Sequence, residues 1–294
     1  MPDNDRLYRF IIENTHVRGE IVHLDATWQA VLDRADYPEN VRTVLGEALA
    51  ACALLAATIK FKGSLILQIR GDGPLHLLVV QTTSAGNMRA IARWKGKVPE
   101  HNLKNIFGNG QMVMTVEPDE GEAYQGIINL QGQHLKHAIE AYFTQSEQLN
   151  TQLWLTTNDE SCAGFLLQEM PQSITDDCEK NDEAWQKANH LAATITDEEL
   201  LDLPVTEVLH RLFHQDDVRL FDAEPLCFRC SCSRDRISNM LLSLGTQEVH
   251  DIIEEQGNIS IDCEFCNAHY EFDKVDVEAI FAADSQPEVP STRH

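Results

Sequence analysis

Four cysteines near the C-terminal end of this 294-residue chain form two close pairs, and their spacing is typical of a metal site. The first pair is Cys230-Ser-Cys232, and the second, after thirty intervening residues, is Cys263-Glu-Phe-Cys266. Two such pairs on separate turns can complete a tetrahedron of sulfur atoms around Zn²⁺. We therefore predict one zinc ion per chain at this cysteine cluster, with an iron–sulfur cluster as the less common alternative.

The residues themselves leave the ligand set and the role of the site open. Cys227-Phe-Arg-Cys230 has the spacing of the common zinc-ribbon pair, so spacing alone slightly favours Cys227 with Cys230 over Cys230 with Cys232. His269 is a further candidate ligand. A Cys-x-Cys pair is the rarer choice for an inert structural site. Because metal-bound thiolates are nucleophiles, an oxidant could attack them. Spacing alone therefore favours neither a structural zinc ribbon nor a redox-sensitive site.

The overall composition indicates a folded protein of a reducing compartment. Hydrophobic residues make up 43% of the chain, and the other cysteines are Cys52, Cys162, Cys178 and Cys227. A secreted disulfide framework would be shorter and would spread its cysteines throughout. No signal-peptide pattern follows the start MPDNDRLYRF. We expect a cytoplasmic protein with no membrane partner.

The charge distribution argues against nucleic acid as a partner. The formal net charge is -24, and residues 175–226 hold 14 acidic and 4 basic side chains, a net -10. Nucleic-acid binders neutralise phosphates with Lys and Arg, and no segment here is basic. High acidity favours solubility, which matters most for a protein that exposes apolar surface.

Residues 1–174 are predicted to form an α+β domain with a mainly antiparallel sheet. Apolar residues at helical spacing predict a helix over 37–60. Its most apolar run, Val44 to Ile59, is shorter than the ~20 residues that a membrane span needs, so we expect a buried helix. A second helix is expected over 135–143. Gly71-Asp72-Gly73-Pro74 should form a turn in which the glycines accept positive φ. Strands are predicted over 64–70, 75–81, 88–94, 111–116, 123–130, 151–157 and 164–170.

Residues 175–226 are predicted to be an acidic, metastable helical linker. Thr196 with Glu199 resembles a capping box, and Pro204 suits a helix start. An apolar stripe follows at helical spacing: Val205, Val208, Leu209, Leu212 and Phe213. We expect a helical hairpin packed on the first domain. Because short acidic helices depend on tertiary packing, the segment could separate when that packing is lost.

Residues 227–294 are predicted to form a small zinc-binding domain. Ser233 caps a helix over 234–244 that stops at Gly245, with Ile237, Met240, Leu241 and Leu244 facing inward. A second helix is expected over 247–255. Strands 259–262 and 269–272 are joined through the Cys263–Cys266 knuckle, and 277–282 adds a final helical turn or two.

The ordered set of motifs resembles the heat-shock-protein-33 family, the redox-regulated holdase chaperones of bacteria, over nearly the whole chain. The most specific part is Cys230-Ser-Cys232-Ser-Arg-Asp-Arg followed by Cys263-Glu-Phe-Cys266-Asn-Ala-His-Tyr. The earlier matches are Arg18-Gly19-Glu20, Gly71-Asp72-Gly73-Pro74, Met88 to Arg93, Gly108-Asn109-Gly110, Tyr124-Gln125-Gly126, Tyr142-Phe143, Ser146 to Leu149 and Leu167 to Pro171.

The resemblance implies a mechanism and a non-enzymatic function. In the reduced state, Cys230, Cys232, Cys263 and Cys266 would bind zinc and the chaperone would be inactive. Oxidation would expel zinc and form the disulfides Cys230–Cys232 and Cys263–Cys266. The small domain and the linker would then unfold, bind unfolding client proteins without ATP, and form a homodimer. Cys227 departs from the family pattern.

Two other functions compete with the chaperone hypothesis. A thiol–disulfide oxidoreductase needs its Cys-x-x-Cys at the start of a helix, whereas Cys263–Cys266 falls between predicted strands. A structural zinc-ribbon adaptor for nucleic acid is disfavoured by the net -8 of residues 227–294.

Overall fold

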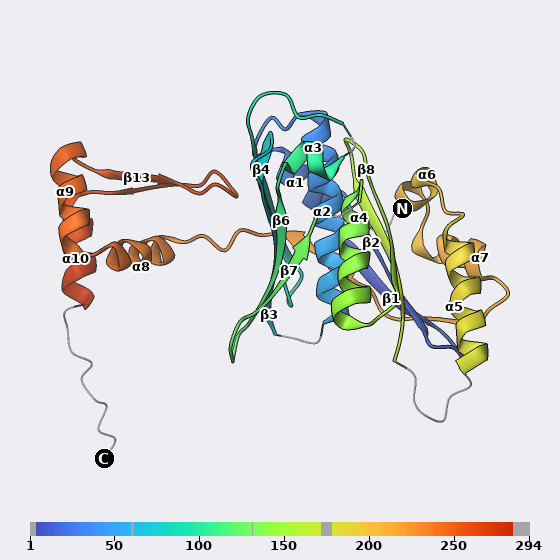
Figure 1. Cartoon of the computed structure of the whole chain (residues 1–294). Helices are drawn as coiled ribbons and strands as arrows, with labels where there is room; N and C mark the ends of the chain where they lie inside the picture. The colour runs from blue at the N-terminus through green and yellow to red at the C-terminus, as the bar shows by residue number, and fades with distance from the viewer. Residues whose placement is uncertain (1–3, 60–61, 101, 131, 172–177, 285–294) are drawn as a thin grey trace, which may run out of the picture. The chain divides into compact units, whose positions relative to one another are not determined.

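The computed structural model describes residues 4–59, 62–100, 102–130, 132–171 and 178–284, and the chain divides into two compact units after Arg229 (Figure 1). Each unit is described by itself. Both contain helices and antiparallel strands, which confirms the predicted α+β class.

The first unit contains two six-stranded sheets. One has the order β10-β1-β2-β9-β8, with β11 also paired to β1; the other has the order β12-β5-β4-β3-β6-β7. The strands are β1 (Arg6–Ile12), β2 (Val17–Leu24), β3 (Gly63–Arg70), β4 (Leu75–Thr83), β5 (Asn87–Trp94), β6 (Gln111–Pro118), β7 (Tyr124–Asn129), β8 (Thr151–Thr157), β9 (Cys162–Glu169), β10 (Val218–Leu220), β11 (Glu224–Pro225) and β12 (Cys227–Phe228).

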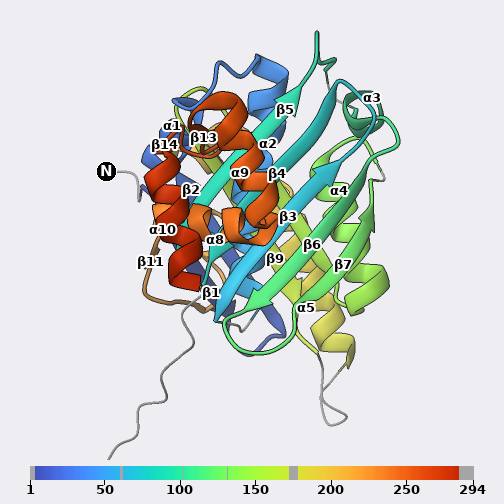
Figure 2. The ribbon, with the colours of Figure 1, turned by 90° about the vertical axis from the view of Figure 1, so that its left-hand side faces the viewer.

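Helices cover the sheets of this unit. They are α1 (Ala26–Leu32), α2 (Glu39–Thr58), α3 (Leu103–Phe107), α4 (Leu135–Tyr142) with the π-helical turn η1 (Phe143–Glu147), α5 (Cys178–Ala192), α6 (Asp197–Asp202) and α7 (Val205–Phe213). Helix α2 packs against β2, β8 and β9 of one sheet and β3, β4 and β5 of the other, so the main core lies around it (Figure 2). Its length and composition would allow a membrane span, but 67% of that window is buried inside the fold, as predicted for a core helix.

The turn between β3 and β4 requires glycine for a reason other than the predicted one. Gly71 and Gly73 do not have positive φ. Instead, a Cβ on Gly71 would lie 1.9 Å from the carbonyl oxygen of Phe107, and one on Gly73 would lie 2.5 Å from that of Ile106. The close approach of two backbone segments, rather than a left-handed conformation, therefore excludes side chains here.

The acidic segment forms a helical layer on the outer face of the first sheet. Phe213 and Leu209 of α7, Leu200 of α6 and Ala188 of α5 are buried against Phe10, Ile21 and other residues of β1, β2 and β9. Thr196 and Glu199 form the predicted capping box at the start of α6. The predicted helical hairpin is thus packed on the first domain.

Strands β1 and β2 and helices α1 and α3 were not predicted. In β2 nearly every side chain is buried, because α2 covers one face and the acidic segment covers the other. The charged residues Arg18, Glu20 and His23 interrupt the apolar alternation that marks an ordinary strand.

The second unit is small. It comprises α8 (Arg234–Leu244), α9 (Thr246–Gln256), β13 (Ile259–Asp262), β14 (His269–Phe272) and α10 (Lys274–Asp284). Ser233 caps α8 and Gly245 ends it, as predicted. Met240 and Leu244, predicted to face inward, are 46% and 52% exposed. The described core has seven buried residues, and only the Ile237–Leu241 side of α8 reaches it.

Candidate metal centre

The four predicted cysteines converge at one point in the second unit. Their sulfur atoms all lie within 4.8 Å of one another. The Sγ atoms of Cys230 and Cys263 are 3.6 Å apart, and those of Cys232 and Cys266 are 3.3 Å apart. Four sulfurs at Zn–S distances of ~2.3 Å in a tetrahedron are separated by roughly 3.8 Å. The donor set and its spacing therefore fit a tetrahedral Zn²⁺ site.

Two loops present these sulfurs. Cys230 and Cys232 immediately precede the N-cap of α8, where Ser233 Oγ accepts from the backbone N–H of Arg236. The Arg236 guanidinium in turn donates to Ser231 Oγ at 2.6 Å. Helix α8 thus holds the Cys-Ser-Cys loop at its own N-terminus.

The second pair lies in a knuckle between two antiparallel strands. The Asn267 N–H donates to the Cys263 carbonyl at 2.8 Å, and the Cys263 N–H donates to the Ala268 carbonyl at 2.9 Å. Asn267 has φ of 58°, a left-handed conformation that Asn tolerates. This position between β13 and β14 differs from the helix N-terminus of a thiol–disulfide oxidoreductase.

Burial opposes ionisation of two of the thiols, Cys263 and Cys266, in the absence of a cation. Desolvation raises the pKa of Cys263 and raises that of Cys266 to about 12. A divalent cation at the centre of the four sulfurs would favour their thiolate forms. The four thiols are therefore suited to holding a metal ion.

The other predicted candidates are not among the four residues of this cluster. Cys227 is exposed on β12, and its Sγ lies 3.4 Å from Asn87 Oδ1. His269 Nδ1 lies 2.7 Å from Asp262 Oδ1. Cys52 and Cys162 are buried in the first unit, and burial raises the pKa of each thiol. The side chain of Cys178 lies outside the described residues.

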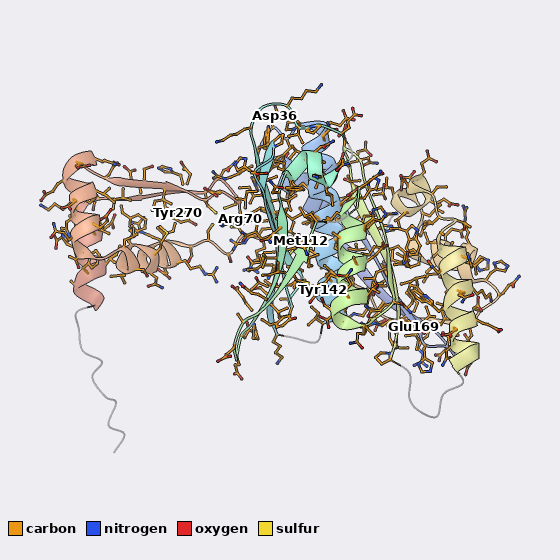
Figure 3. The ribbon with its side chains drawn as sticks, in the orientation of Figure 1. Asp36, Arg70, Met112, Tyr142, Glu169 and Tyr270 are labelled. Atoms are coloured by element: carbon orange, nitrogen blue, oxygen red, sulfur yellow. The ribbon has the colours of Figure 1, made fainter. Side chains whose placement is uncertain are left out.

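The structure adds one residue that the spacing did not indicate. This residue is Tyr270 of β14, which is labelled in Figure 3. Its hydroxyl donates to Cys232 Sγ at 3.2 Å, and this bond raises the pKa of Tyr270 to about 12. The hydroxyl therefore remains a donor at neutral pH. The only sequence signal was the position of Tyr270 four residues after Cys266, on the strand that follows the knuckle.

Tyr270→Phe is expected to accelerate oxidation of the site. A hydrogen bond to a ligand sulfur withdraws charge and lowers its nucleophilicity, and loss of such outer contacts typically changes metal affinity or activity by roughly tenfold or more. Zinc released into a colorimetric chelator during peroxide treatment should therefore appear roughly tenfold faster. Tyr124→Phe, at an exposed tyrosine of the first unit, is the matched control. Equal release rates for the Tyr270 variant and the parent would contradict this role.

Comparisons with known proteins extend the similarity to the whole chain. The family model described as Hsp33 protein matches residues 5–273. A protein of Nitrosococcus oceani named 33 kDa chaperonin is 48% identical over 294 residues, which is 100% of both chains. One of Pseudomonas syringae pv. tomato with the same name is 44% identical, over 100% of this chain and 99% of its own.

A solved structure has the same fold. The crystal structure of the 33 kDa chaperonin (heat shock protein 33 homolog) of Thermotoga maritima matches with a TM-score of 0.79. The match covers 96% of this chain and 100% of that chain at 21% sequence identity. At this identity the likeness is evidence for the architecture alone.

Proposed function

Because this chain belongs to the Hsp33 family and is a chaperone, we propose that it is a redox-regulated, ATP-independent holdase whose four-cysteine site controls client binding. The observation that carries the proposal is the convergence of Cys230, Cys232, Cys263 and Cys266 in a unit with a very small core. In the reduced protein these four thiolates hold one Zn²⁺, which supplies the cross-link between the two loops.

The second unit depends on that cross-link. Its seven described core residues are few for a stable domain, and structural zinc contributes on the order of 10–16 kcal/mol to folding in small zinc peptides. Residues 227–294 therefore act as a zinc-binding redox-switch domain.

Oxidation removes the ligands. Two equivalents of a two-electron oxidant such as hypochlorous acid or peroxide convert four thiolates to the disulfides Cys230–Cys232 and Cys263–Cys266. The oxidant oxygen leaves as hydroxide, and hypochlorous acid also yields chloride. A disulfide sulfur no longer carries the charge that binds the metal, so the second unit loses its main stabiliser.

The acidic linker over 175–226 is the element released next. Only the short strands β10, β11 and β12, of three, two and two residues, join α7 to the cysteine loop. When residues 230–284 unfold, these strands can fray and α5 to α7 can leave the first sheet. Their separation uncovers apolar residues such as Phe10, Phe165 and Leu209, while the net -10 of the linker preserves solubility.

The uncovered surface binds unfolding proteins in the cytoplasm by apolar contact, without catalytic turnover. The oxidised protein forms a homodimer. Neither nucleic acid nor a membrane is a partner, since no segment carries the required excess of basic residues.

Light scattering from a thermally unfolding client tests the proposal directly. The oxidised protein is expected to suppress aggregation and the reduced zinc form is not. Equal suppression by both forms would reject redox control, and no suppression by either would reject the holdase function. An insulin-reduction assay on the same samples separates the oxidoreductase alternative, for which catalytic turnover is required.

A further inference from the structure

Sequence motifs that the redox mechanism does not use meet at one edge of the second sheet. Strand β7 carries the Tyr124-Gln125-Gly126 motif and is the last strand of that sheet, beyond β6 (Figure 2). A Cβ on Gly126 would lie 2.9 Å from Tyr142 Oη, and this hydroxyl donates to Glu147 Oε1 at 2.8 Å. Gly126 and Ile128 are buried. The motifs therefore hold β7 from its buried face.

Strand β7 lacks the features that usually protect an exposed sheet edge, which are charged side chains, proline, a bulge or a covering segment. Its six residues, Tyr-Gln-Gly-Ile-Ile-Asn, include neither charge nor proline, and they pair with β6 in an unbroken register. Ile127 is 66% exposed, and among the described residues none forms a backbone hydrogen bond with the outer edge of β7. Every second residue of an antiparallel edge strand directs its N–H and C=O away from the neighbouring strand, so β7 presents a row of unpaired backbone groups.

The loop that leads into β7 is strongly acidic. Four exposed carboxylates lie within six residues: Glu117, Asp119, Glu120 and Glu122. A segment that ran antiparallel beside β7 would bring the residues that follow it to this loop. Lysine or arginine at those positions would be attracted, and aspartate or glutamate would be repelled. The edge therefore combines an uncharged backbone row with a negative charge at one end.

We propose that β7 binds an extended, β-branched segment of an unfolding client protein, followed by basic residues, as an added strand of the second sheet. The backbone of the segment pairs with the unpaired row of β7. A β-branched side chain beside Ile127 continues the cross-strand contact that Ile127 makes with Val113 on β6. The inference rests on the chaperone function for the identity of the partner. Because the acidic linker packs on the first sheet, this edge is available before oxidation, but a contact of six residues is too short to hold an unfolding protein by itself.

Fluorescence anisotropy of a labelled peptide, Thr-Val-Ile-Val-Thr-Lys-Lys, with the reduced, zinc-bound full chain tests the proposal. A Glu-Glu ending should weaken binding at low salt by roughly threefold or more, and added salt should reduce that difference. N-methylation of alternate residues leaves one edge of the peptide able to pair, so its affinity should be kept. N-methylation of consecutive residues blocks both edges and should weaken binding at least roughly tenfold. Equal affinities of the two methylated peptides, or tighter binding of the Glu-Glu peptide, would overturn the proposal.

Ile127→Lys locates the site, because a lysine is the usual protection of an exposed edge. It should weaken peptide binding at least roughly fivefold and leave the melting temperature unchanged, since Ile127 is exposed. Val275→Lys, at a valine of α10 that is 75% exposed, is the matched control. In light scattering with the oxidised protein, half-protection of a client should require several times more Ile127→Lys than Val275→Lys.

The outcomes separate this inference from the holdase function. If the oxidised parent and oxidised Ile127→Lys protect a client equally, the edge is not a client site and the holdase function stands. If the reduced parent binds the peptide but the oxidised parent protects no client, the holdase function fails and the edge is still a strand-binding site. Sedimentation that shows a reduced dimer, returned to monomer by Ile127→Lys, would assign the edge to a second copy of the chain and overturn the proposal.

Discussion

Cys232→Ser is expected to bind no zinc that survives dialysis and to leave residues 230–284 unfolded. The serine hydroxyl is a poor zinc ligand, and three sulfurs cannot complete the closed tetrahedron that a structural site needs. With only seven described core residues, the second unit has little else to offset its conformational entropy. Zinc content by mass spectrometry and amide signals by NMR measure the two effects.

The matched control is Cys227→Ser. Cys227 is exposed on β12 and lies outside the four-sulfur cluster, so this variant should retain about one zinc per chain and a folded second unit. Chelation of zinc from the parent protein should reproduce the Cys232→Ser spectrum. If Cys227→Ser lost zinc while Cys232→Ser retained it, Cys227 rather than Cys232 would be a zinc ligand.

Phe213→Ala is expected to give a protein that protects clients while still reduced and zinc-bound. Phe213 is 1% exposed, and its ring centroid lies 6.0 Å from that of Phe10. Truncation of a buried Phe costs about 3–5 kcal/mol. This cost is large compared with the free energy that holds α5 to α7 on the sheet, because three short helices have little stability without their packing. The linker should therefore detach without oxidation.

Light scattering in excess reductant, with zinc content measured on the same sample, checks this outcome. Tyr124→Ala removes an aromatic ring that is 56% exposed, and it should remain inactive when reduced. Hydrogen exchange over α5 to α7 reports detachment independently. If those amides exchange freely while the reduced variant still fails to protect clients, the buried surface is not the client-binding surface.

Local sequence rules predicted the second unit closely. Ser233 and Gly245 delimit α8 because a hydroxyl cap and a glycine stop act within one turn of the helix. The strands on either side of the knuckle were predicted at the residues where they occur. The exposed positions of Met240 and Leu244 were not, since helical spacing shows two apolar stripes without showing which one a neighbour covers.

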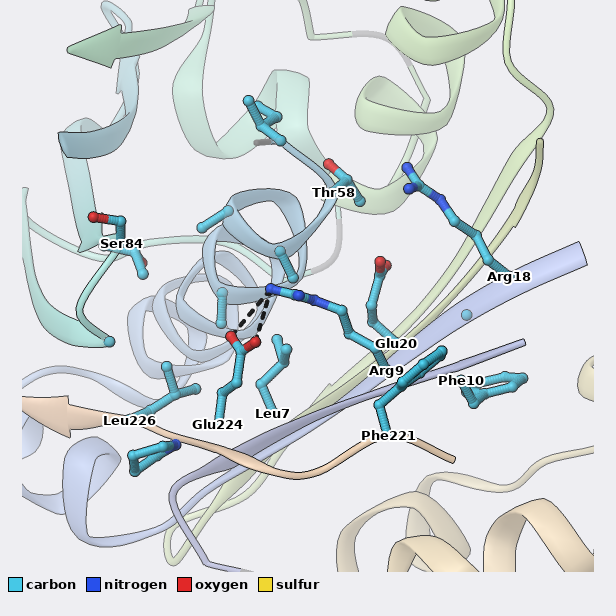
Figure 4. A pocket seen from close by; sticks show the side chains of 18 of the residues that line it. Leu7, Arg9, Phe10, Arg18, Glu20, Thr58, Ser84, Phe221, Glu224 and Leu226 are labelled. Carbon is cyan, nitrogen blue, oxygen red and sulfur yellow. Dashed lines mark hydrogen bonds and ion pairs between the residues drawn. The ribbon is translucent and has the colours of Figure 1, made fainter. Parts of the chain in front are cut away.

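The first unit was predicted less well at strand β2, which other elements cover on both of its faces. The charged residues of β2 hid a strand, because Glu20 is buried at the wall of a pocket beside the end of α2 (Figure 4) and a ring nitrogen of His23 donates to the Leu200 carbonyl of α6. These environments arise from segments nearly 180 residues apart in the chain. The alternation of apolar and polar residues along the strand cannot indicate contacts with such distant segments.

The sequence by itself determined the presence of a cysteine cluster near the C-terminal end, the helix ends and the acidic segment, because thiol spacing, caps and charge are local properties of the chain. Tertiary structure decided which surfaces are covered and which polar atoms meet. It placed Tyr270 on Cys232, the linker on the first sheet, and Glu20 in a buried position beside the end of α2. Each of these depends on packing between distant segments, where burial and desolvation set the energy of a side chain.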